Sequence, residues 1–284
     1  MTYQELEKEG SDLLTFAGVM DPRVDARQLL LFVSKKSAAS LLLDQRETVP
    51  LEVEGEYRNL LEKRQKRVPL QHIIGETEFM GLTFQVSSDV LCPRQDTEIL
   101  VEEVLRLLKD GDGILDLCTG SGCIGISLMV LGSRRIGGLK LDGADLSEKA
   151  LAVARRNAWR NGLREGEADY YNGDLFDAIP AGRKYNVIVS NPPYIPSRYI
   201  EQLMPEVRDH EPLMALDGME DGLFFYRKIT QQAPFYLKEG GLLCYEIGYD
   251  QGESVPKLLQ QAGFMDVRVI KDLSGNDRVV IGHL

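Results

Sequence analysis

Residues 191–194, which we call the proline segment, read NPPY and directly follow the apolar run YNVIVS. Proline has no N–H and fixes φ, so the segment predicts a stiff bend whose carbonyls can accept hydrogen bonds. A planar –NH2 group could donate to the Asn191 side-chain oxygen and the Pro192 carbonyl while Tyr194 stacks on its plane. An amide nitrogen is a poor nucleophile because its lone pair is delocalised. The segment therefore predicts catalysis by positioning and by stabilising positive charge on an attacking amide nitrogen.

A glycine-rich turn lies upstream, within ILDLCTGSGCIGISL at residues 114–128. Its pattern predicts a strand, a tight turn and a helix N-terminus, with Gly120 and Gly122 allowing close approach of the backbone to a ligand. A dinucleotide site is one interpretation, but its fingerprint is G-x-G-x-x-G, whereas Asp116 here precedes Cys-Thr-Gly-Ser-Gly. A carboxylate disfavours a diphosphate and favours a cation. S-adenosyl-L-methionine, with its ammonium and sulfonium groups, therefore fits this glycine loop, residues 118–122, better than NAD does.

Acidic residues stand at the exits of two further predicted strands. Asp145 ends LDGADLS, where a carboxylate can accept both ribose hydroxyls, and Asp142 is the alternative earlier in the strand. Asp174, in GDLF, could accept from an adenine amino group, with Phe176 or Leu175 covering the ring. Each acid taken alone could be an ordinary turn or capping residue, and for Asp174 this interpretation fits equally well. Together they favour a nucleoside-containing cofactor, because ligands of open α/β sheets bind at the carboxyl ends of the strands.

The elements that must position these residues fall into three regions. Residues 1–70 carry apolar residues at three- and four-residue spacing, which predicts a helical domain. Residues 71–93 contain short β-rich runs separated by glycines, which predicts a β-hairpin linker. Strands and helices alternate over residues 94–284, which predicts an α/β domain with a mostly parallel sheet and helices on both faces.

Composition excludes several classes of protein. The 284 residues carry a net charge of −11, from 33 basic and 44 acidic residues, which argues against broad binding to nucleic-acid phosphates. No stretch approaches about 18 apolar residues, so no membrane span is expected, and the acidic N-terminus is unlike a signal peptide. The four cysteines form no C-x-x-C pair and, with three histidines, no obvious zinc pattern, so no metal is expected. We therefore expect a reduced cytoplasmic enzyme.

Sequence motifs longer than NPPY make the functional prediction more specific. NPPY is shared by methyltransferases that act on the amino groups of adenine, cytosine and glutamine amides. From about Pro69 to the C-terminus, the sequence resembles the release factor glutamine N5-methyltransferases, the HemK/PrmC family. The segments that carry the resemblance are PLQHIIG, LCPRQDTE, ILDLCTGSG, DLF, SNPPYI, HEPLMAL and GNDRVV, and a helical N-terminal domain resembles the family less specifically.

This resemblance implies a Rossmann-like, seven-stranded class I methyltransferase domain with a small helical N-terminal domain. It implies methyl transfer from S-adenosyl-L-methionine to the glutamine of the Gly-Gly-Gln motif in class I peptide chain release factors, leaving S-adenosyl-L-homocysteine. We expect a monomer in which residues 1–70 recognise the protein substrate, with no direct nucleic-acid partner and no membrane partner.

The residue patterns and the resemblance together predict a site. The predicted catalytic residues are Asn191, Pro192 and Tyr194. The predicted glutamine site adds Pro193 and Arg94 to these three. The predicted cofactor site comprises Asp116, Cys118, Thr119, Gly120, Ser121, Gly122, Asp145, Asp174, Phe176 and Asn191.

Three of the surrounding residues raise questions of their own. Cys118 stands where many family members have glycine; a small residue still fits, and its backbone is expected to avoid positive φ. Arg94 either contacts the substrate or forms a structural ion pair with Asp96 or Glu98. Glu211, in HEPLMAL, is either structural or close to the pocket.

Three other functions compete with this prediction. A DNA adenine methyltransferase would use the same chemistry, but the net charge, the lack of an inserted recognition domain and the mixed charge after NPPY argue against it. A glutamine methyltransferase of a large-subunit ribosomal protein shares NPPY, so only the flanking motifs argue against it. The intact proline segment disfavours a cofactor-binding regulator without catalysis.

Overall fold

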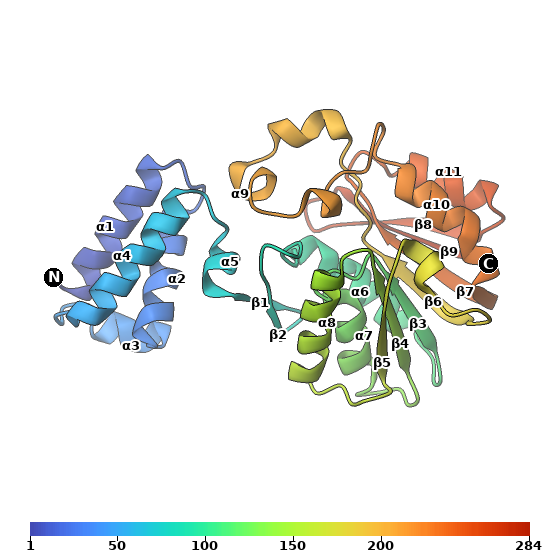
Figure 1. Cartoon of the computed structure of the whole chain (residues 1–284), viewed down its shortest axis with the longest axis horizontal. Coiled ribbons are helices and arrows are strands. Elements are labelled where there is room, and N and C mark those ends of the chain that lie inside the picture. Colours follow the sequence, from blue (N-terminus) through green and yellow to red (C-terminus); the bar gives the residue numbers. More distant parts are fainter. The chain divides into compact units, whose positions relative to one another are not determined.

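The computed structural model describes residues 1–284, which form two compact units (Figure 1). The smaller unit contains Met1–Gly75 together with Met204–His210, and the larger contains Glu76–Leu203 and Glu211–Leu284. The chain thus leaves the larger unit once, near its middle, to complete the smaller one. The sequence pattern did not indicate this excursion, and it placed the end of the N-terminal region at residue 70.

Helices build the smaller unit, as the apolar spacing predicts. The helices are α1 (Tyr3–Phe16), α2 (Pro22–Ser34), α3 (Ala38–Leu43), α4 (Leu51–Gln65), α5 (Leu70–Ile74) and α9 (Pro205–Arg208). The first begins with a capping box, in which the Thr2 hydroxyl accepts from the Glu5 N–H and the Glu5 carboxylate accepts from the Thr2 N–H. Apolar side chains of α1, α2 and α4 bury one another at the centre of the unit, including Leu6, Leu29 and Leu61.

A buried group of ion pairs attaches α9 to this helical unit. Arg64 donates to Asp25 at 2.7 Å and to Glu206 at 2.9 Å, and Arg67 donates to both carboxylate oxygens of Glu206 at 2.6 Å. Arg64 is 5% exposed, so losing either carboxylate would leave a buried charge without compensation. These contacts span about 140 residues of sequence, which explains why local patterns cannot reveal them.

The predicted hairpin is confirmed, in a shorter form. Strands β1 (Glu76–Phe79) and β2 (Leu82–Gln85) pair antiparallel around a turn at Met80 and Gly81, both with positive φ. Residues 71–74, which were expected in the hairpin linker, instead belong to helix α5. The side chain of Asn157 both accepts from the Gln85 N–H and donates to the Gln85 carbonyl, which ties the hairpin to the larger unit.

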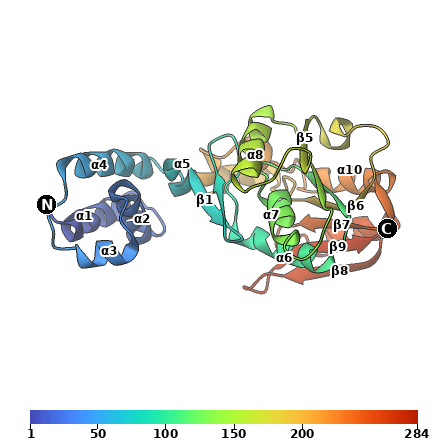
Figure 2. The same ribbon diagram turned by 90° about the horizontal axis from the view of Figure 1, so that it is seen from below.

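A seven-stranded sheet forms the centre of the larger unit (Figures 1 and 2). Its strands are β3 (Gly113–Leu117), β4 (Lys140–Asp145), β5 (Ala168–Asn172), β6 (Tyr185–Ser190), β7 (Leu237–Glu246), β8 (Met265–Lys271) and β9 (Asp277–His283). The order is β5-β4-β3-β6-β7-β9-β8, and only β9 runs antiparallel to its neighbours. The strand order reverses between β3 and β6, and ligands of such sheets bind outside the carboxyl ends at this point.

Helices cover both faces of the sheet, as predicted. Helices α6 (Gln95–Leu107), α7 (Cys123–Gly132) and α8 (Glu148–Arg160) contribute to one buried cluster, and α10 (Phe224–Gln232) and α11 (Ser254–Gln261) to the other. Side chains alternate along each strand: Ile114 belongs to the first cluster and Leu115 to the second. Short 3₁₀ turns span Leu175–Ala178, Ser197–Gln202, Leu213–Ala215 and Ala233–Phe235. None of the helices combines the length and apolar character that crossing a membrane requires.

Candidate functional site

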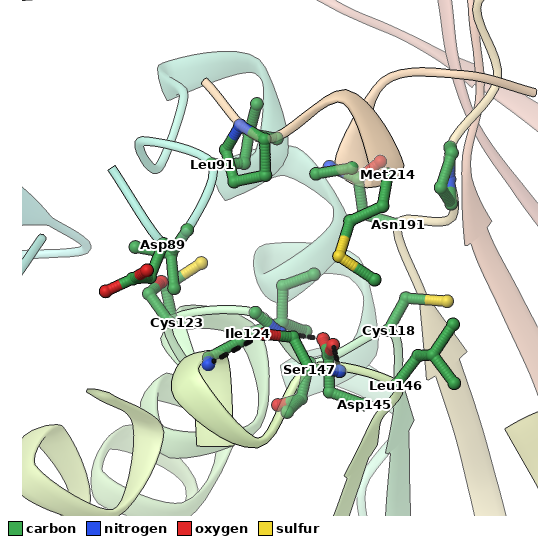
Figure 3. A pocket seen from close by; sticks show the side chains of 18 of the residues that line it. Asp89, Leu91, Cys118, Cys123, Ile124, Asp145, Leu146, Ser147, Asn191 and Met214 are labelled. Carbon is green, nitrogen blue, oxygen red and sulfur yellow. Dashed lines mark hydrogen bonds between the residues drawn. The ribbon is translucent and has the colours of Figure 1, made fainter. Parts of the chain in front are cut away.

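A cavity of about 1000 Å³, counting its open mouth, lies at the carboxyl edge of the sheet (Figure 3). The exits of β3, β4, β5 and β6 all contribute to its wall, together with segments 89–94 and 212–215. The wall includes nine of the predicted site residues: Arg94, Cys118, Thr119, Gly120, Ser121, Asp145, Asp174, Asn191 and Pro193.

The glycine loop follows β3 and runs into helix α7. Cys118, Gly120 and Gly122 all have positive φ, at 59°, 55° and 81°. The expectation that Cys118 avoids positive φ is therefore wrong. Hydrogen bonds hold the turn instead: the Thr119 N–H donates to the Ala144 carbonyl at 3.0 Å, which sets the backbone just after Cys118. Left-handed backbone at a non-glycine residue costs on the order of 1–2 kcal/mol.

Asp116 lies beneath the glycine loop and does not line the cavity. It is completely buried, and it accepts from the Thr119 hydroxyl at 2.7 Å and from the Gly125 N–H at 3.0 Å. Burial raises the pKa of Asp116 to about 7, and the two hydrogen bonds oppose this rise. The side chain is thus placed to hold the loop and the start of α7, at one remove from any bound molecule. Gly122 also stays out of the wall, because it packs against Ile126 and Ala154.

Asp145 presents its carboxylate at the cavity edge, held by two backbone donors. The Gly120 N–H donates to one oxygen and the Ser147 N–H to the other, both at 2.9 Å. Figure 3 labels Asp145, Leu146 and Ser147 together at this edge. Burial raises the pKa of Asp145, and the backbone donors oppose the rise. The fixed carboxylate can accept further hydrogen bonds from a pair of hydroxyl groups.

Asp142, the alternative acid on the same strand, is committed elsewhere. The Tyr185 hydroxyl donates to it at 2.6 Å, and Arg183 approaches it at 3.4 Å. It is 4% exposed and does not line the cavity. Its burial raises its pKa, although the Tyr185 hydroxyl and Arg183 act in the opposite direction.

Beyond β5, the structure separates the three residues that were considered for the adenine end of the cofactor. Asp174 lines the cavity, and Lys228 donates to one of its oxygens at 2.8 Å. Phe176 does not reach the wall: it is 1% exposed and stacks on Tyr236 with ring centroids 4.4 Å apart. Leu175 lines the cavity in its place.

The proline segment lies on the other side of the strand-order reversal, after β6. Asn191 and Pro193 line the cavity, whereas Pro192 is buried and Tyr194 half-buried outside its wall. A side chain fixes the end of the segment: the Gln251 side-chain amide donates to the Tyr194 carbonyl at 3.3 Å. Burial raises the pKa of the Tyr194 phenol well above its ordinary value, so the hydroxyl stays protonated.

The segment after Tyr194 is clamped as well. Ile195 donates to the Leu216 carbonyl at 3.0 Å and accepts from the Gly218 N–H at 2.8 Å. A Cβ at Gly218 would lie 2.7 Å from the Tyr194 backbone, so only glycine allows this close approach.

Arg94 pairs with Glu211, so the structural alternative considered for it, an ion pair with Asp96 or Glu98, is wrong. One Arg94 nitrogen donates to both Glu211 oxygens, at 2.7 and 2.8 Å. Glu211 is buried, and its carboxylate also accepts from the Cys92 N–H at 3.3 Å. The other two acids have different partners, since Asp96 lies 3.2 Å from Arg278 and Glu98 accepts from the Met80 N–H. Glu211 is therefore structural, while Arg94 also faces the cavity.

Sequence reasoning missed an apolar part of the wall. Leu91 and Met214 line it, from segments that precede α6 and follow α9 (Figure 3). The motif HEPLMAL was the available signal for the second of these segments. Three cysteines also line the cavity, namely Cys92, Cys118 and Cys123. Burial raises the thiol pKa of Cys92 and of Cys123 to about 12, and that of Cys118 further.

Comparisons with known proteins agree with this architecture. Two family models match, "PrmC N-terminal domain" at residues 5–75 and "Methyltransferase small domain" at residues 93–204. A release factor glutamine methyltransferase of Geobacter sulfurreducens is 44% identical, covering 80% of this chain and 77% of the relative. The enzyme of the same name from Clostridium botulinum is 38% identical, covering 99% of this chain and 98% of the relative.

Solved structures share the fold at lower identity. A methyltransferase from Pyrococcus furiosus has a TM-score of 0.53 and 20% identity, over 78% of this chain and 98% of that one. The 16S rRNA N2 G1207 methyltransferase of T. thermophilus, in complex with AdoMet and guanosine, has a TM-score of 0.51 and 16% identity, over 73% and 49%. These two likenesses concern the fold alone.

Proposed function

Because the chain belongs to the release factor glutamine methyltransferase family, we propose that it methylates the glutamine of the Gly-Gly-Gln motif in class I peptide chain release factors. The methyl group comes from S-adenosyl-L-methionine and joins the side-chain amide nitrogen, N5. The enzyme acts as a monomer in the cytoplasm, and its helical N-terminal region recognises the protein substrate.

The observation that carries the proposal is that the glycine loop and Asn191 line one cavity. Ser190 supports their proximity, because its hydroxyl donates to the Leu117 carbonyl at 2.7 Å, joining the ends of β6 and β3. A donor held by the glycine loop and an amide held by the proline segment would thus face each other.

The residues present fit S-adenosyl-L-methionine. The Asp145 carboxylate is fixed by two N–H donors and suits the two ribose hydroxyls. Asp174 and Leu175 offer an acceptor and an apolar surface for an adenine. When bound, the cofactor supplies a methyl group on a positively charged sulfur, which is already activated for transfer.

The chain's own residues have the task of orienting the target amide. The Asn191 side-chain oxygen and the Pro192 carbonyl would accept its two N–H groups, which restricts the nitrogen and stabilises positive charge as it attacks. Transfer would replace the carbon–sulfur bond of the bound cofactor with a carbon–nitrogen bond on the target amide. One proton would then pass from the alkylated nitrogen, which is acidic at that stage, to water, so no strong base is required.

A methylation assay with four substrates tests the proposal. The protein is incubated with labelled S-adenosyl-L-methionine and, separately, with a class I release factor, the same factor with the motif glutamine replaced by alanine, a large-subunit ribosomal protein, and DNA. We expect label only on the first. Label on the alanine variant would mean that a different residue of the release factor is methylated. Preferential label on ribosomal protein or DNA would overturn the assigned substrate.

A further inference from the structure

Glu246 is the buried acid that stands beside Asn191 in the sheet. Strands β6 and β7 are parallel neighbours with Ser190 opposite Tyr245, so Asn191, which directly follows β6, comes level with Glu246, the last residue of β7. The two side chains therefore leave the sheet at the same edge. Asn191 lines the cavity, whereas Glu246 is 2% exposed and does not.

The surroundings of Glu246 are unusual for a structural carboxylate. No ion pair within hydrogen-bonding distance neutralises it, and its Oε2 atom is buried without a close hydrogen-bond partner. The Thr97 and Asn191 side chains are both close enough to the carboxyl to act against the rise in its pKa. An acceptor is thus available next to Asn191, from a residue that does not itself line the cavity.

The orientation of the Asn191 amide matters for the reaction. An asparagine side chain has an acceptor end and a donor end, and the hydrogen-bond network decides which way it turns. Only the oxygen can accept an N–H of the target glutamine. The reversed amide would set its own N–H groups against those of the target.

We propose that Glu246 is a positioning residue whose ionised carboxylate accepts from the Asn191 amide nitrogen and so turns the Asn191 oxygen toward the target glutamine. This role rests on the proposed function, because it presumes that Asn191 holds an amide. The protonated carboxyl has the opposite effect, since its O–H can donate to the Asn191 oxygen and reverse the side chain.

The titration of Glu246 supports a pH-dependent orientation. Burial raises its pKa to about 7, and Asp96 on α6 adds to this rise. Thr97, Arg278 on β9 and Asn191 act in the opposite direction. The other titratable groups that face it are Tyr194, Cys123 on α7 and Tyr226 on α10, whose pKa values are all raised above this range, so they stay neutral. Because the ionised form is the productive one, methyl transfer should decline as pH falls through about 7.

Single-turnover transfer by Glu246→Gln, with cofactor and release factor pre-bound, tests the role. Glutamine can turn either end of its amide toward Asn191, so it no longer fixes the orientation of that side chain. We therefore expect the transfer rate to fall about 10- to 100-fold, by analogy with the loss of hydrogen-bond partners that orient metal-ligating residues. Cofactor affinity by calorimetry should not change. Glu246→Asp keeps a carboxylate and should recover part of the rate. Asp142→Asn is the matched control, because that carboxyl is equally buried in the same sheet but outside the cavity wall.

The pH profile and the side-chain amide signal of Asn191 give readouts that a merely structural role would not move. In the wild type, the transfer rate and the ¹⁵N–H₂ signal of Asn191, assigned by its loss in Asn191→Ala, should both change around pH 7. Both changes should be absent from Glu246→Gln. The proposal is overturned by a wild-type rate in Glu246→Gln, by an equal loss in Asp142→Asn, or by a wild-type amide signal that does not respond to pH.

Different results would overturn the proposed role of Glu246 and the proposed function. The amide signal needs no substrate, so it reports on the orientation of Asn191 even if the release factor is not the substrate. Absence of label on the release factor with the wild-type protein would instead overturn the proposed function. The wild-type measurements also keep the test decisive if Glu246→Gln does not fold.

Discussion

The glycine loop and the proline segment form facing parts of one cavity, but they are rigid for different reasons. Carboxylates hold the glycine loop: Asp116 accepts from Thr119 and Gly125 beneath it, and Asp145 accepts from Gly120 beside it. The proline segment depends on its own two prolines and on hydrogen bonds to its backbone, such as that from the Gln251 side chain to the Tyr194 carbonyl. One side therefore presents the Asp145 carboxylate to the cavity, as suits a cofactor with hydroxyl groups, and the other presents the neutral Asn191 amide, as suits an amide substrate.

Because the two sides differ in this way, changes in the proline segment should lower the rate of methyl transfer, whereas changes beside the glycine loop should weaken cofactor binding. Asn191→Ala should have the largest effect. Removing a preorganised group that stabilises developing charge costs about 10²–10³ in rate, by analogy with oxyanion-hole donors. Docking of the release factor should weaken much less, because the proposed function assigns recognition of the protein substrate to the helical N-terminal region. The transfer rate is measured in single turnover with pre-bound cofactor and release factor.

Two further variants make this test specific. Asn191→Asp keeps acceptors but loses the NH2 group and adds charge, so we expect partial activity at best. Asn161→Ala is the control, because that asparagine is tied to the Thr83 carbonyl and does not line the cavity. A wild-type transfer rate in Asn191→Ala would remove the proline segment from the reaction.

On the opposite side, Asp145→Ala should weaken cofactor binding at least tenfold. Hydrogen bonds to a charged group contribute roughly 1.5–3 kcal/mol each, and two ribose hydroxyls would lose their acceptor. Calorimetry with S-adenosyl-L-methionine measures the change. Asp169→Ala, which removes an exposed acid of β5 outside the cavity wall, should leave the affinity unchanged. Equal affinities of Asp145→Ala and wild type would mean that this carboxylate does not hold the cofactor.

The smallest expected effects concern the backbone of the glycine loop. Cys118→Gly relieves a positive φ but adds freedom to the unfolded chain, so the free energy of unfolding should rise by at most about 1 kcal/mol. Gly122→Ala should act in the opposite direction, because its Cβ would lie 2.7 Å from Ile126 and 3.2 Å from Ala154 at a φ of 81°. Urea unfolding of both variants measures the difference. A destabilised Cys118→Gly would mean that the thiol contributes more than its backbone strain costs.

The sequence predicts the sheet and both sides of the cavity because their signals are local. Apolar runs followed by Asp145 and by Asn191 indicate strands that end at a common edge, and the parallel register follows from the alternation of strands and helices. The pairing of Arg94 with Glu211 could not be predicted, because 117 residues separate them and nearer acids offered equally good partners. The positive φ of Cys118 is imposed by a neighbouring strand, through the hydrogen bond to the Ala144 carbonyl. The conformational preference of a non-glycine residue alone would predict a negative φ at Cys118.

The three cysteines in the cavity wall bear on the chemical safety of the enzyme. A sulfonium methyl donor is an alkylating agent, and thiolate is the most readily alkylated group that a protein carries. Burial raises the pKa of the Cys92 and Cys123 thiols to about 12 and that of Cys118 further, so all three remain protonated near neutral pH. Because the thiol is a far weaker nucleophile than the thiolate, these side chains can line the cavity without competing for the methyl group. The same burial that shapes the cavity thus disfavours the thiolate form of all three side chains.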